Sequence, residues 1–157
     1  MDEKDLKIFI QAVPHYFRQI FDEEAVVDPP FLQGKESVIQ DYIGVIGISG
    51  KHKGAVYFTA SQPMVREMLI AYRENDLTEE DESDIVGEVA NTISGYARRE
   101  FGGDFLISVP MVLKGKPESV SFPKNTRSFI IPFVWRGFRS YLIIALEGTA
   151  AGNSPDA

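Results

Sequence analysis

The sequence predicts an α+β fold in which antiparallel β-hairpins form a sheet packed with helices. Three observations indicate this class. Apolar residues recur at three- and four-residue steps in several stretches, as on one face of a helix. Runs rich in β-branched residues are joined in pairs by short turns that contain glycine, as in hairpins. Helical and strand patterns do not alternate strictly, which disfavours a doubly wound parallel sheet.

The predicted order is a helix, two strands, two helices and three strands. The helices are expected over 5–21, from an N-cap at Ser61 to 73, and from an N-cap at Thr78 to 101. The strands are expected over 38–49, 55–60, 105–113, 128–135 and 140–147. Pro14 should kink or split the first helix, because proline removes an internal hydrogen bond. Pro132 indicates an edge position or a bulge.

Length and composition fit one soluble domain, predicted over 1–147, with a disordered tail over 148–157. A net charge of −7 disfavours nucleic acid and anionic membrane surfaces as partners. The absence of cysteine excludes disulfides and thiolate chemistry. No secretory leader and no spanning apolar run is visible, so we expect a cytoplasmic protein.

The helix after Thr78 has two distinct faces at 100° per residue. Its apolar face is predicted to hold Ile85, Val86, Val89, Ala90, Ile93 and Ala97, with Phe101 at its end. Its opposite face carries Asp84, Glu88, Asn91 and Gly95, almost in line.

A polar face alone is ordinary in a helix, but this helix also contains residues that disfavour helical structure. Asn91, Gly87 and Gly95 are poor helix formers, and the glycines flank the acid and the amide where a bulky side chain would obstruct another surface. We call the row Asp84, Glu88, Asn91 and Gly95 the exposed stripe. Unfavourable helix residues gathered around one such stripe are typical of a functional site. Glu88 could pair with a lysine, and the amide of Asn91 could orient a water molecule. This pair suits phosphoryl transfer, with the reacting centre supplied by a partner protein.

The segment Asp84-Ile85-Val86-Gly87-Glu88-Val89-Ala90-Asn91 resembles the D/S-x-x-x-E-x-x-N signature of the CheC/CheX family of chemotaxis phosphatases. The following Asn91-Thr92-Ile93-Ser94-Gly95 is also similar to that family. CheC-type members carry two signatures, and this sequence has one in a helical context, so it looks most like CheX. The family also has a proline downstream of the asparagine, for which Pro110 is the candidate.

The resemblance implies a phosphatase that hydrolyses the aspartyl phosphate of CheY-like response-regulator receiver domains in two-component signalling. Glu88 would contact the active-site lysine of the receiver, Asn91 would orient the hydrolytic water, and Asp84 would support them. The protein would need no cofactor of its own, because the receiver holds Mg²⁺. CheX-like members can form homodimers.

Two other functions stay open: a non-catalytic receiver-binding or adaptor module, and a structural or oligomerising domain. The two histidines, His15 and His52, lack acids at ligand spacing, so no metal site is predicted. Gly44, Gly47 and Gly50 are expected to be packing or bulge glycines, not a phosphate loop. The acidic run 79–82 is expected to complement the helix dipole. Trp135 is expected in the core or, alternatively, at an exposed dimer edge.

Overall fold

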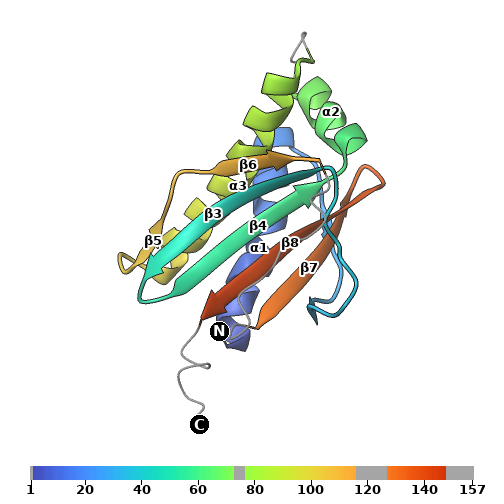
Figure 1. The fold of residues 1–157 in the computed structure, drawn as a ribbon. Helices are drawn as coiled ribbons and strands as arrows, with labels where there is room; N and C mark the ends of the chain where they lie inside the picture. The colour runs from blue at the N-terminus through green and yellow to red at the C-terminus, as the bar shows by residue number, and fades with distance from the viewer. Residues whose placement is uncertain (1, 73–76, 116–126, 148–157) are drawn as a thin grey trace.

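The described part of the chain forms one antiparallel sheet with helices: in the view of Figure 1, α1 and α3 run behind the sheet and α2 lies beyond its upper end. The computed structural model describes residues 2–72, 77–115 and 127–147. The helices are α1 (Glu3–Phe21), α2 (Gln62–Ala71) and α3 (Glu79–Phe101). The strands are β1 (Val26–Val27), β2 (Phe31–Leu32), β3 (Tyr42–Gly50), β4 (Lys53–Ala60), β5 (Phe105–Ile107), β6 (Met111–Lys114), β7 (Ser128–Trp135) and β8 (Phe138–Glu147).

Two long hairpins form the centre of the sheet, as the sequence predicts. The strand order is β1-β7-β8-β4-β3-β5, with β2 also on β7 and β6 also on β3. The β3–β4 and β7–β8 hairpins join through antiparallel pairing of β4 with β8. The predicted α+β class with antiparallel hairpins is therefore confirmed.

Several strand boundaries differ from the predictions. β3 begins at Tyr42, four residues after its predicted start, and β1 and β2 were not predicted because each is only two residues long. The strand predicted over 105–113 is two strands. Ser108 leaves the ladder there, since its backbone N–H donates to the Gly47 carbonyl and its hydroxyl accepts from the Gly47 N–H at 2.8 Å. Pro110 then removes one backbone donor before β6 begins.

Both prolines singled out in the sequence sit in regular elements. The split predicted at Pro14 is wrong, because α1 is one helix of 19 residues with Pro14 inside it. Pro132 lies in β7 between the residues that pair with β1 and those that pair with β2. Its carbonyl accepts from the Asp28 N–H at 2.9 Å, and no ladder bond from its nitrogen is needed there.

The core lies between the sheet and the helices. Alternate residues of β3, β4, β7 and β8 pack with α1, α2 and α3 in one apolar cluster. Trp135 is fully buried in it, so the alternative of an exposed edge is wrong. The predicted tail over 148–157 lies outside the described residues. Among those described, no helix combines the length and the apolar character needed to cross a membrane.

Candidate functional site

Helix α3 carries the four residues predicted to form the exposed stripe. Asp84, Glu88 and Asn91 are exposed, and Gly95 is half-buried. Among the described residues, the side chains of Glu88 and Asn91 have no hydrogen bond and no ion pair. The acid and the amide therefore lie one turn apart on the same face, both free to meet a partner.

The two ends of α3 are fixed by local interactions. The Thr78 side chain accepts a hydrogen bond from the Asp81 N–H, as predicted for an N-cap. At the other end the Phe101 ring stacks on Phe105 with centroids 4.6 Å apart, and it contacts Phe9 of α1. The predicted apolar face is buried from Ile85 to Ala97. These contacts orient the exposed stripe away from the sheet.

The middle of α3 approaches β3 closely because Gly44 lacks a side chain. A Cβ at Gly44 would lie 3.0 Å from the Val86 carbonyl oxygen and 3.2 Å from the Ala90 Cβ. This confirms the packing role expected for Gly44. Val86 lies two residues before Glu88, and Ala90 lies one residue before Asn91. This contact therefore fixes the distance of Glu88 and Asn91 from the sheet.

Gly87 has a different role from the predicted one. It is buried, and a Cβ there would lie 3.2 Å from the Val112 Cγ2 and 3.5 Å from the Pro110 Cβ. The close approach that its missing side chain permits is therefore to β6 and the residue before it, within the same chain. Pro110 thus lies against α3 one turn before Asn91.

Gly95 agrees with the prediction that a missing side chain leaves room for another surface beside Asn91. A Cβ at this position would have no heavy atom within 4 Å outside its own helix. Nothing in the described packing of the chain requires a glycine at this position. Its missing side chain leaves an opening next to Asn91 on the exposed stripe.

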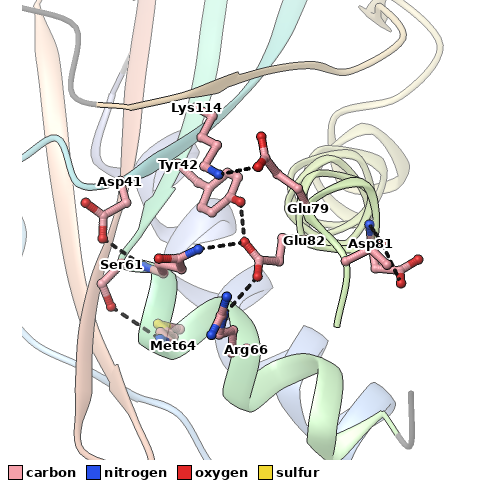
Figure 2. Close-up of polar contacts among 11 residues, drawn as sticks. Asp41, Tyr42, Ser61, Met64, Arg66, Glu79, Asp81, Glu82 and Lys114 are labelled. Carbon is pink, nitrogen blue, oxygen red and sulfur yellow. Dashed lines mark hydrogen bonds and ion pairs between the residues drawn. The ribbon is translucent and has the colours of Figure 1, made fainter. Parts of the chain in front are cut away.

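A buried polar network at the start of α3, shown in Figure 2, was not predicted from the sequence. Glu82 was expected to complement the helix dipole, but its side chain is 1% exposed. One carboxylate oxygen accepts from the Tyr42 hydroxyl and from Gln62 Nε2 at 3.1 Å, and the other accepts from Arg66 Nε at 2.9 Å. The network ties α3 to β3 and α2. The steps 82, 85, 89 and 93 already place Glu82 on the apolar face, which was the available signal.

Hydrogen bonding controls the charge of this network. Burial acts to raise the pKa of Glu82, but hydrogen bonds from Tyr42, Gln62 and Arg66 outweigh it and hold that pKa below its ordinary value. Burial and the hydrogen bond to Glu82 raise the pKa of Tyr42, so its hydroxyl stays protonated as a donor. Glu79, one turn earlier on α3, instead forms a surface ion pair with Lys114 at 2.9 Å (Figure 2).

The charge of Glu88 acts on Tyr16, a buried tyrosine of α1. Burial is the main cause that raises the pKa of Tyr16, followed by the negative charge of Glu88 and then by Tyr72. The Tyr16 hydroxyl is therefore protonated at neutral pH and lies in the electrostatic range of the Glu88 carboxylate.

The chemistry available on the stripe is that of positioning. A carboxylate can pair with a cationic side chain, and an amide can both donate to and accept from a water molecule. Within the described ranges, no group of three or more His, Cys, Asp or Glu side chains is arranged to hold a metal ion. His15 instead packs on Tyr96, and His52 packs on Phe101 and Phe105.

The sequence matches the family model described as "Chemotaxis phosphatase CheX" over residues 42–134. The chain belongs to the CheX family. This match runs from the first residue of β3 to the last but one of β7 and includes the whole of α3. No curated protein matches the sequence.

Solved CheX structures have the same fold as this family member. The CheX of Vibrio vulnificus is 25% identical with a TM-score of 0.80, and the match covers 92% of this chain and 99% of that one. The CheX of Desulfovibrio desulfuricans is 25% identical with a TM-score of 0.81 over the same shares. A CheX–CheY–BeF₃–Mg²⁺ complex from Borrelia burgdorferi is 20% identical with a TM-score of 0.73, covering 90% of this chain and 96% of that one, and this likeness concerns the fold alone.

Proposed function

We propose that this CheX-family protein accelerates hydrolysis of the aspartyl phosphate of a CheY-like response-regulator receiver. The observation that carries the proposal is that Glu88 and Asn91 lie on one exposed face of α3 and have no side-chain partner in the described part of the chain. Family membership and the structure of a CheX relative with CheY, BeF₃ and Mg²⁺ support the choice of partner.

In the proposed mechanism Glu88 pairs with a lysine of the receiver and so orients the docked domain. Asn91 holds a water molecule through its amide and directs it at phosphorus, opposite the aspartyl oxygen. A bond forms between the water oxygen and phosphorus, and the bond from phosphorus to the aspartyl oxygen breaks. The products are inorganic phosphate, which keeps the protons of the water, and a free aspartate carboxylate. Mg²⁺ would be held by the receiver and would neutralise the phosphoryl charge.

Asp84 and Gly95 have supporting roles in this proposal. Asp84 is exposed one turn before Glu88, where its charge would add to the attraction for a cationic partner group. Gly95 leaves the partner room beside Asn91. Gly87 acts indirectly, because its contact with β6 and Pro110 sets the position of α3.

The direct test is the rate of phosphate loss from phosphorylated receivers of the same organism, with and without the protein. We expect Asn91→Ala to lower the acceleration by at least about 100-fold, the usual effect of removing one group that stabilises a transition state. Glu88→Ala should mainly weaken binding of the receiver. Glu100→Ala is a matched control, because Glu100 is exposed on α3 but lies on another side of the helix.

Each outcome discriminates among the three functions. Acceleration that needs Asn91 supports the phosphatase. Binding that needs Glu88 without any acceleration would favour the adaptor function. If neither binding nor acceleration occurs with any receiver, the result would favour a structural or oligomerising domain. Measurement of the molecular mass in solution tests the homodimer that the family resemblance implies.

A further inference from the structure

The charges on the exposed stripe of α3 are separated by sign along the helix. Several acids of its first turns are already engaged, since Glu79 binds Lys114, Glu82 is buried and Asp81 takes part in the cap with Thr78. Three exposed acids on this stripe or in line with it have no side-chain partner among the described residues: Glu80, Asp84 and Glu88. The exposed Glu100 lies on another side of the helix. The free negative charge of the stripe therefore lies before Asn91.

A free positive charge lies on the other side of Asn91. Arg98 is exposed, and its guanidinium has no hydrogen bond or ion pair among the described residues. It follows Asn91 by seven residues, which places it about 20° around the helix and about 10 Å along the axis. The neighbouring Arg99 is turned toward α1, where its guanidinium lies 5.8 Å from the Tyr96 ring centroid. Tyr96 in turn packs on His15 of α1 at 4.7 Å.

Between Asn91 and Arg98 the exposed stripe carries only Gly95, which has no side chain. Gly95 lies three residues before Arg98, and a side chain there would meet only open space. Side chains of a helix tilt toward its N-terminus, so a long side chain at position 98 covers the turn that contains position 95. The Arg98 guanidinium can therefore extend across Gly95 toward the amide of Asn91.

We propose that Arg98 is a docking residue that engages an acidic side chain at the rim of the receiver's phosphorylation site. This inference rests on the proposed function, and it adds a second electrostatic anchor to Glu88. A receiver held by opposite charges at both ends of the stripe can dock in one orientation only, because the reversed orientation would place like charges together. Asn91 lies between the two anchors, where the phosphoryl group must sit.

The positive charge at the end of α3 has a second explanation, which the test must distinguish from docking. Arg98 and Arg99 both lie in the last turn of α3, where a cation complements the helix dipole. Both arginines would have this stabilising effect in similar measure. Arg98 alone is nearly in line with Asn91, so Arg99→Glu is a matched control with the same charge change in the same turn.

The experiment measures KM and kcat for dephosphorylation of the receiver, with thermal unfolding of each variant recorded in parallel. We expect Arg98→Glu to raise KM about tenfold and to change kcat less than twofold, the pattern of lost binding without lost chemistry. Arg98→Lys should stay within about threefold of the original KM, as should Arg99→Glu. The affinities of the variants for a receiver loaded with BeF₃⁻ and Mg²⁺ should follow the same ranking as their KM values. The differences in affinity between variants should shrink at high salt.

The outcomes separate this inference from the proposed function. If the protein accelerates dephosphorylation and Arg98→Glu leaves KM and affinity unchanged, the docking role of Arg98 is wrong and the phosphatase stands. Equal losses in Arg98→Glu and Arg99→Glu, or a loss confined to kcat, would also overturn the docking role. If the unmodified protein neither binds nor dephosphorylates any receiver, both proposals are wrong.

Discussion

Removal of the buried carboxylate in Glu82→Ala should strongly destabilise the protein. Glu82 accepts three hydrogen bonds from β3 and α2, and its side chain is 1% exposed. The variant would leave the hydroxyl of the fully buried Tyr42 without its acceptor and would open a cavity beside it. It would also release the start of α3 from β3 and α2.

The size of the stability loss in Glu82→Ala depends on how exposed the partners of Glu82 are. Breaking a buried ion pair by removing one partner costs about 3–5 kcal/mol in the free energy of unfolding. The Arg66 side chain is 52% exposed, so solvent screens its share and the lower end applies. We therefore expect Glu82→Ala to cost about 3 kcal/mol. Glu82→Gln should cost about 2 kcal/mol, because an amide nitrogen must then face at least one donor.

Chemical denaturation at pH 7 measures this loss directly. Glu79→Ala is the matched control, because Glu79 lies one turn earlier, is 72% exposed and forms an ion pair with Lys114. Its loss should stay below about 1 kcal/mol, as is usual for surface ion pairs. A cost below about 1 kcal/mol for Glu82→Ala, equal to that of the control, would refute the view that this network anchors α3.

The pH dependence gives a second check on the same network. The pKa of Glu82 is lower in the folded protein than its ordinary value, because the hydrogen bonds outweigh burial. The stabilisation from its charge is therefore complete above the unfolded-state pKa of about 4.3, and it is lost as the pH falls through the lower folded-state value. The difference between the unmodified protein and Glu82→Gln should accordingly be largest near pH 7 and narrow below about pH 4.

Four further substitutions test other parts of the fold by thermal or chemical unfolding. Gly95→Ala should stabilise α3 by roughly 0.5–1 kcal/mol, because its Cβ meets open space. Gly44→Ala should destabilise the protein, because its Cβ meets a backbone carbonyl at 3.0 Å. A change of the same sign in both variants would contradict the packing described. Thr78→Ala should cost about 1 kcal/mol through loss of the N-cap, and no change would mean that the cap is dispensable. Glu23→Ala should cost about 1–2 kcal/mol, because the buried Trp135 indole N–H loses its acceptor at 2.9 Å; an unchanged stability would show that water replaces the carboxylate.

The long elements of this protein were predictable because local patterns fix them. The caps at Ser61 and Thr78 and the apolar periodicity of α3 each depend on residues close in sequence. β1 and β2 were not predictable, since two residues carry no periodicity and form strands only by pairing with β7. The break between β5 and β6 likewise depends on the bonds of Ser108 to Gly47, 61 residues away in sequence.

The exposed stripe of the site was also predictable, but its support was not. The 100° spacing of α3 correctly placed Glu88 and Asn91 on the exposed face. The partners of Glu82 lie 16 to 40 residues away, and the neighbours of Gly87 lie on β6, so only the folded chain brings them together. The roles of Glu88 and Asn91 in catalysis remain predictions, for which the kinetic tests above are designed.

The anchoring of α3 has a consequence for the entropy of docking. The helix is held by Glu82 at its start, by close contact with Gly44 in its middle and by the stacked Phe101 at its end. Its backbone therefore has little freedom left to lose when a partner arrives. What remains to be ordered is a few side-chain torsions of Glu88 and Asn91, at about 0.5–1.5 kcal/mol for each side chain. A helix braced in this way can bind weakly and release its partner quickly, and still present the same geometry at every encounter.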